Sequence, residues 1–221
     1  MLGENLNCWL SDRQKQGHLV LRNKELKTDL PGFVIFLQRE CVSLDLQYND
    51  FELIGESLGM MESLRELNLS HNNLRGEECL PASLSSLKRL QSVSVADNQL
   101  EQIPLSVCGL GASLERLEVQ DNLLDHLPHQ LGALTGLLSL NASYNNISHL
   151  PECLTTLSHL SMLLLDGNVL LDPLPASLPA LVHLCHLSLQ STGLVCYPSK
   201  CLTPDMPFRL SFLQSSSNFP L

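Results

Sequence analysis

His183, Cys185 and His186 come closest to a chemical site in this chain, because imidazole and thiolate groups bind zinc. In an extended strand, however, Cys185 and His186 would point to opposite faces, and one tetrahedral ion could not easily take both. Gly109-Leu110-Gly111 lacks the preceding strand and following helix with which a glycine loop cradles a phosphate. P-loop, zinc-protease and nucleophile-elbow motifs are absent. We therefore expect no enzyme, no cofactor and no metal site.

The remaining polar and aromatic side chains are suited to binding a partner rather than to catalysis. They occupy equivalent variable positions of a phrase that recurs along the chain, in the segment just before a repeated Asn. These positions are predicted to lie on the concave face of a sheet. Eleven of them are candidate partner-binding residues: Asp45, Tyr48, Asn68, Asp97, Glu118, Asp121, Asn141, Tyr144, Met162, Leu164 and Asp166.

Two kinds of side chain stand out in this set. Tyr48 and Tyr144 are amphipathic rings of the type enriched at binding hot spots. Met162 and Leu164 would put apolar side chains on an otherwise polar face, which can mark a contact patch. For each of these residues the alternative is an ordinary solvated or edge position.

Acidic residues are the third kind. Asp97, Glu118 and Asp121 belong to neighbouring units, with Arg116 as the lone cation near them, and such a group suits a basic segment of a protein partner. The formal net charge of −10 argues against nucleic acid or an anionic membrane surface, since both need a basic patch. No Lys or Arg occurs from Leu117 to Ser199, although a neutral solvated surface is the alternative interpretation.

All these residues are positioned by one phrase, L-x-x-L-x-L-x-x-N-x-L. Clear copies run from Leu64 to Leu74 and from Leu160 to Leu170. A degenerate first unit has Lys24 in the Asn slot, and a worn copy surrounds Leu210, so we count about eight repeats plus a degenerate ninth. The other residues in the Asn slot follow one another at 23 to 26 residues: Asn49, Asn72, Asn98, Asn122, Asn145, Asn168 and Thr192.

The spacing predicts the local structure of each unit. The last two leucines of L-x-x-L-x-L alternate with polar residues, so they face one side of a short strand. The Asn can then satisfy backbone groups that the following turn leaves unpaired. On the return path leucines recur every three residues, which suits short 3₁₀ turns, and extra residues at Gly76–Glu78 predict a convex bulge. The predicted fold is an α/β solenoid, a horseshoe with a parallel concave β-sheet and short 3₁₀ or irregular convex segments.

The phrase is the signature of a leucine-rich repeat. With return-path pairs such as Leu127-Pro128 and Leu150-Pro151, the chain resembles the intracellular L-x-x-L-P group of leucine-rich repeat proteins, which includes the Ras-suppressor and Scribble/Erbin-type scaffolds. The resemblance spans about residues 40–195. It implies a cytosolic adaptor or regulator that binds other proteins.

The N-terminus and the cysteines bear on the compartment. Residues 1–16 lack the apolar stretch of a signal peptide, and no apolar run approaches the roughly 20 residues of a membrane helix. We therefore expect a cytoplasmic protein without a membrane span, while a bridge between Cys196 and Cys201 stays open. Single cysteines in different repeats behave as small hydrophobes in a reducing compartment: Cys41, Cys79, Cys108 and Cys153.

The ends depart from the repeat. Residues 1–16 are predicted to be a lead-in and possible cap, residues 17–213 the repeat domain, and residues 214–221 a disordered tail. The apolar run at 32–37 fits a cap under the first repeat, with a binding motif as the alternative. The terminal Phe219-Pro220-Leu221 matches sequences that carboxyl-terminus-capturing domains hold.

These patterns predict a non-enzymatic scaffold or adaptor that binds a protein partner on its concave face. The alternative is a substrate-recognition or regulatory subunit of an enzyme complex, such as a ubiquitin ligase or a phosphatase. Its catalytic partner would then bind the irregular ends of the chain. Nothing in the pattern selects an oligomeric state.

Overall fold

The structure, a computed structural model of the 221-residue chain, describes residues 17–27, 30, 40–170, 174–175 and 177–192, and the backbone of 209–211. The expectations for residues 1–16, the apolar run at 32–37, the Cys196–Cys201 pair and the tail at 214–221 lie outside the described residues.

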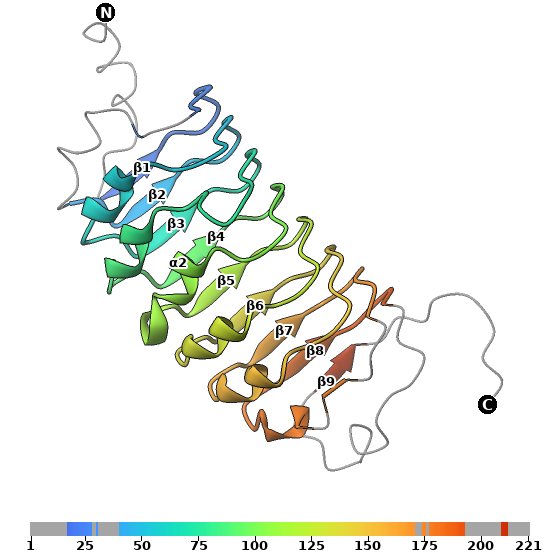
Figure 1. The fold of residues 1–221 in the computed structure, drawn as a ribbon. Coiled ribbons are helices and arrows are strands. Elements are labelled where there is room, and N and C mark those ends of the chain that lie inside the picture. The colour runs from blue at the N-terminus through green and yellow to red at the C-terminus, as the bar shows by residue number, and fades with distance from the viewer. Residues whose placement is uncertain are drawn as a thin grey trace, which may run out of the picture.

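Short strands form one parallel sheet of nine members in sequence order, as Figure 1 shows. The middle residue of each strand pairs with the middle residue of the next, for example Leu44 with Leu67, and from β1 to β8 this residue is buried. The predicted parallel sheet is therefore confirmed. The strands are β1 His18–Val20, β2 Ser43–Asp45, β3 Glu66–Asn68, β4 Ser92–Ser94, β5 Arg116–Glu118, β6 Ser139–Asn141, β7 Met162–Leu164, β8 His186–Ser188 and β9 Arg209–Ser211.

The chain returns along the opposite side of the stack through short helical turns (Figure 1). The predicted 3₁₀ segments are confirmed, with a one-turn α-helix, α2 (Leu105–Cys108), as a departure in which the Gly109 N–H donates to the Leu105 carbonyl. No helix among the described residues is long and apolar enough to cross a bilayer. The 3₁₀ helices are η2 Glu56–Met60, η3 Ala82–Ser86, η4 Gly111–Ser113, η5 His129–Ala133, η6 Glu152–Thr156 and η7 Leu178–Ala180.

A continuous leucine core fills the space between the sheet and the helical turns. In η5, for example, Leu131 is the buried residue, and it lies in the same core as Leu117 and Leu140 of the strands. Complete burial of a leucine side chain stabilises the fold by about 1.5–3 kcal/mol. The extra residues predicted as a bulge, Gly76–Glu78, form an exposed turn between β3 and η3.

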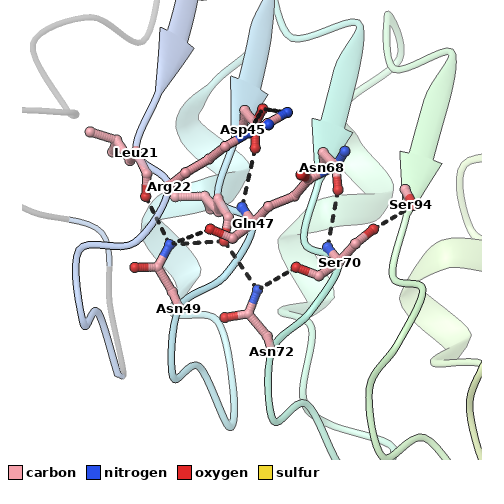
Figure 2. A network of polar contacts seen from close by, with 10 residues as sticks. Leu21, Arg22, Asp45, Gln47, Asn49, Asn68, Ser70, Asn72 and Ser94 are labelled. Atoms are coloured by element: carbon pink, nitrogen blue, oxygen red, sulfur yellow. Dashed lines mark hydrogen bonds and ion pairs between the residues drawn. The ribbon is translucent and has the colours of Figure 1, made fainter.

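The Asn of each phrase connects neighbouring repeats, as Figure 2 shows for Asn72. Its Nδ2 donates to the carbonyls of Leu69 and Ser70 in its own turn, at 2.9 and 3.2 Å, and to the Leu46 carbonyl of the preceding repeat at 3.0 Å. Its Oδ1 accepts the Phe51 N–H at 3.2 Å. Both ends of a buried amide are thereby satisfied.

The same pattern recurs at every asparagine of this column, which we call the asparagine ladder: Asn49, Asn72, Asn98, Asn122, Asn145 and Asn168. At the position after the ladder, the Thr192 hydroxyl donates one bond, to the Leu189 carbonyl at 2.9 Å. A hydroxyl has one hydrogen to donate and an amide group has two, so Thr192 cannot reproduce the ladder.

Candidate protein-binding surface

Six of the eleven candidate residues lie on the strands. They flank the buried middle residue of each strand, so their side chains lie on the opposite, solvent-facing side of the sheet. We call this side the open face of the sheet. The six are Asp45, Asn68, Glu118, Asn141, Met162 and Leu164.

Four more candidates lie in turns that directly follow a strand. Their backbone is left-handed, with φ between 51° and 56°, a conformation that favours glycine and costs other residues about 1–2 kcal/mol. Each turn is held by the next repeat; the Tyr144 N–H, for example, donates to the Asp166 carbonyl at 2.6 Å. With His71, which has the same backbone, these residues form what we call the turn row: Tyr48, His71, Asp97, Asp121 and Tyr144.

Side chains of the turn row contact one another across repeats. The Tyr48 ring stacks on the His71 ring, with centroids 4.3 Å apart and planes 6° from parallel. His71 Nδ1 lies 2.5 Å from Asp97 Oδ2. The sequence analysis did not select His71, although its place one residue before Asn72 was a visible signal.

The Tyr144 ring lies over the turn that follows β7, where Gly167 has a φ of 66°. A Cβ atom on Gly167 would lie 2.5 Å from Cδ1 of Tyr144, so the ring occupies the space above the glycine. Tyr144 is nevertheless 60% exposed. The glycine thus allows a large aromatic ring to lie against it and still face solvent.

Several candidate side chains also bond their own backbone, which Figure 2 shows for Asp45 and Asn68. The side-chain oxygens of Asp45, Asn68 and Asn141 each accept the backbone N–H two residues later, at 3.0 to 3.2 Å. Asp45 also pairs with Arg22 at 2.5 Å. Such bonds support the local turn, so substitution of these residues would change stability as well as any binding.

Asp166, in the turn that follows β7, also has a structural role. Its Oδ1 accepts the Ser188 hydroxyl and the Gln190 N–H, both at 2.6 Å. This aspartate therefore connects β7 to the strand that follows it. Like the three residues above, it is a poor probe of binding alone.

The remaining candidates present their side chains to solvent. Tyr48 is 48% exposed and Met162 is 40% exposed, Leu164 is half-buried, and the carboxylates of Asp97, Glu118 and Asp121 are exposed. Arg116 is directed to Glu115, at 3.5 Å. In the part of the chain that the structure describes, no ion pair neutralises Glu118 or Asp121.

The possible metal ligands and the cysteine thiols are the other chemically suggestive residues. No group of three or more His, Cys, Asp or Glu side chains could hold a metal ion within the described ranges. Burial raises the pKa of the Cys79 thiol to about 12 and those of Cys41 and Cys108 to about 11. Because the thiolate is the reactive form, these cysteines are inert at neutral pH.

Comparison with known proteins agrees with the fold. The family profile described as "Leucine rich repeat" matches residues 112–170, and a second profile of the same description matches residues 63–87. These matches, the parallel sheet and the asparagine ladder identify the chain as a leucine-rich repeat protein.

The chain spans less than half the length of the curated relatives it matches. It is 32% identical to rat osteomodulin over 80% of this chain and 40% of that protein. It is 29% identical to human oligodendrocyte-myelin glycoprotein over 96% of this chain and 45% of that protein. With the adenylate cyclase of Schizosaccharomyces pombe it shares 33% identity over 87% of this chain but 11% of the enzyme.

Solved structures at low sequence identity resemble this chain in fold alone. An internalin C2 from Listeria monocytogenes has a TM-score of 0.73 at 21% identity, covering 89% of this chain and 80% of that one. The chain in a TLR13–ssRNA13 complex has a TM-score of 0.78 at 21% identity, covering 89% of this chain and 28% of that one.

Proposed function

We propose that this protein is a non-enzymatic scaffold or adaptor that holds a protein partner against the open face of its sheet and the adjoining turn row. Leucine-rich repeats form a protein-interaction fold, and the chain is built of them. The observation that carries the proposal is the turn row itself. Consecutive repeats carry rings or charges at left-handed positions where glycine would be easier, and Tyr48 and Tyr144 remain about half exposed there.

The charge of this surface favours a partner with a basic segment. Asp97, Glu118 and Asp121 are exposed carboxylates on adjacent repeats, and Arg116 is directed to Glu115. Complementary charge mainly accelerates association and selects among partners, while buried aromatic contacts supply most of the affinity. The tyrosines are therefore the expected anchors, and the carboxylates are expected to confer selectivity.

We also propose that the protein works in the cytoplasm. The five described cysteines, one of them the exposed Cys185, are all unpaired, a state that a reducing compartment maintains. Fractionation of cells that express the full-length protein tests this proposal. Recovery in a secretory or extracellular fraction would refute it.

A comparative pull-down from cell extract tests the binding surface. The native protein is compared with the variant Tyr48→Ala, Glu118→Lys, Tyr144→Ala. This variant changes exposed side chains and keeps the three that accept the backbone N–H two residues later, Asp45, Asn68 and Asn141. We expect specific partners to be lost from this variant while its unfolding temperature stays close to native.

A control variant makes the same types of change on the helical side of the stack: Met60→Ala, Glu62→Lys, Leu105→Ala, all at exposed positions. It should keep every partner. An unchanged partner list for the first variant, or equal losses from both, would rule out the open face and the turn row as the binding surface.

A further inference from the structure

The open face changes character along the stack. From β2 to β6, every residue that flanks the middle of a strand is polar or charged, and the same is true of β8. On β7 both flanking residues are apolar, Met162 and Leu164. Met162 is 40% exposed and Leu164 is half-buried, so an apolar patch interrupts a polar surface.

Acidic side chains lie two strands away from this patch. Glu118 is on β5, and Asp121 is in the turn that follows β5. Neither carboxylate has an ion-pair partner among the described residues, and the sequence supplies no Lys or Arg from Leu117 to Ser199. Arg116 flanks the same strand as Glu118 but contacts Glu115, so no described residue neutralises either carboxylate, and both are available to a cation of another molecule.

Tyr144 lies between the two groups, because it follows β6, which pairs with β5 on one side and β7 on the other. Its ring lies over the Gly167 backbone and is 60% exposed. Exposed aromatic rings line the surfaces on which proline-rich segments dock as polyproline II helices. Acidic, aromatic and apolar groups thus follow one another on β5, β6 and β7.

The spacing of these groups restricts the ligand. Neighbouring strands are about 4.8 Å apart, so β5 and β7 are separated by about 10 Å. A polyproline II helix advances about 3.1 Å per residue and repeats every three residues, so residues i and i+3 face the same side about 9 Å apart. In a β-strand, residues on one side are about 7 or 13 Å apart, so of these two extended conformations polyproline II matches the separation of β5 and β7 more closely.

We propose that the open face binds a polyproline II segment of the partner, which crosses the strands at β5 to β7. A Lys or Arg of the segment pairs with Asp121 and Glu118, a large apolar residue three positions away packs on Met162 and Leu164, and the residues between them contact Tyr144. This inference rests on the proposed function and specifies the chemistry of the partner.

Synthetic peptides test the spacing directly. Nine-residue fluorescent peptides carry one Lys and one Leu two, three or four positions apart in a Gly/Ser background, with an additional three-position peptide that has two prolines between them. Binding to the purified full chain is measured by fluorescence polarisation. We expect the three-position peptide with prolines to bind at least ten-fold more tightly than the two- and four-position peptides. Equal affinity at all spacings, or no binding by any peptide, would overturn the inference.

Charge exchange tests the acidic half. Asp121→Lys should weaken binding of the Lys peptide at least ten-fold and should bind a peptide with Glu in place of Lys more tightly than the native chain does. The control Glu62→Lys, an equal change in net charge at an exposed position outside the surface, should alter neither affinity. Equal effects of both substitutions would show that net charge, not this site, governs binding.

The two proposals fail separately. If the pull-down variant loses its partners but the peptide series shows no preference for three positions, the proposed function stands and the polyproline II inference is wrong. If the pull-down is unchanged, the proposed function is wrong for the native partners, while the peptide series still decides whether the site has this specificity.

Discussion

At the residue scale, the asparagine ladder bonds each repeat to the preceding one. Each amide replaces bonds to water with bonds inside the protein: its NH2 group contacts three carbonyl oxygens and its oxygen accepts at least one N–H, and these partners belong to two repeats. A buried carbonyl or N–H left without a partner costs about 1–3 kcal/mol, so the ladder is sensitive to any truncation.

We predict that Asn122→Ala lowers the free energy of unfolding by about 2–4 kcal/mol, because it leaves the Leu100 N–H without its partner and removes one of the two donors to the Val95 and Val119 carbonyls. Urea denaturation followed by circular dichroism measures the change. Asn146→Ala is the control, since Asn146 is exposed and should change stability by less than about 0.5 kcal/mol. Similar losses of stability in the two variants would contradict the conclusion that the asparagine ladder stabilises the fold.

At the element scale, the turn after each strand decides what the surface displays. The turn after β7 has glycine where the turns after β2 to β6 have Tyr, His or Asp, and the Tyr144 ring uses the space that the missing side chain leaves. One glycine therefore determines the position of an aromatic ring that belongs to the neighbouring repeat.

We predict that Gly167→Ala destabilises the protein more than Gly76→Ala does, by about 1 kcal/mol, because only the first displaces a ring. Both glycines are left-handed, with φ of 66° and 76°, so the backbone strain of alanine is similar at the two positions. A Cβ atom at Gly76 meets nothing within 4 Å.

Thermal unfolding measures both changes, and the double variant Tyr144→Ala, Gly167→Ala isolates the ring contact. In the Tyr144→Ala background, Gly167→Ala should cost no more than Gly76→Ala. If the extra cost persists without the ring, a contact other than Tyr144 is responsible.

At the scale of the whole molecule, stability is distributed along one dimension. Each strand pairs only with the preceding and the following strand, and the order β1 to β9 follows the sequence. In such a stack each repeat is stabilised by its two neighbours, so a local defect should spread according to its place in the stack.

We predict that Leu117→Ala on β5 destabilises more of the neighbouring repeats than Leu187→Ala on β8 does, although both remove a fully buried leucine. Each should lose about 2–5 kcal/mol of local stability. Native-state hydrogen exchange should then show faster exchange on both sides of β5 for Leu117→Ala, but faster exchange only near β8 for Leu187→Ala. Uniform acceleration over all repeats in both variants would show that the stack unfolds as a single unit.

The architecture could be predicted from the sequence because each unit is short, local and repeated. The alternation around Leu67 and Leu69 indicates a strand, the three-residue spacing of Leu131 and Leu134 indicates a 3₁₀ turn, and neither depends on distant residues. Recurrence of the phrase every 23 to 26 residues then determines how the units stack. Comparison of equivalent positions in successive repeats also identified side chains that face solvent, such as Glu118 and Tyr144.

Only the tertiary structure decided which of those side chains are free and which are engaged. Asp45 and Asn68 looked equivalent to Glu118 in the sequence, yet they accept backbone N–H groups and Glu118 does not. The stack of Tyr48 on His71 and the ring of Tyr144 over Gly167 join different repeats. Such contacts depend on rotamers and on the distance between neighbouring turns, quantities that the packed solenoid sets and that no single repeat encodes.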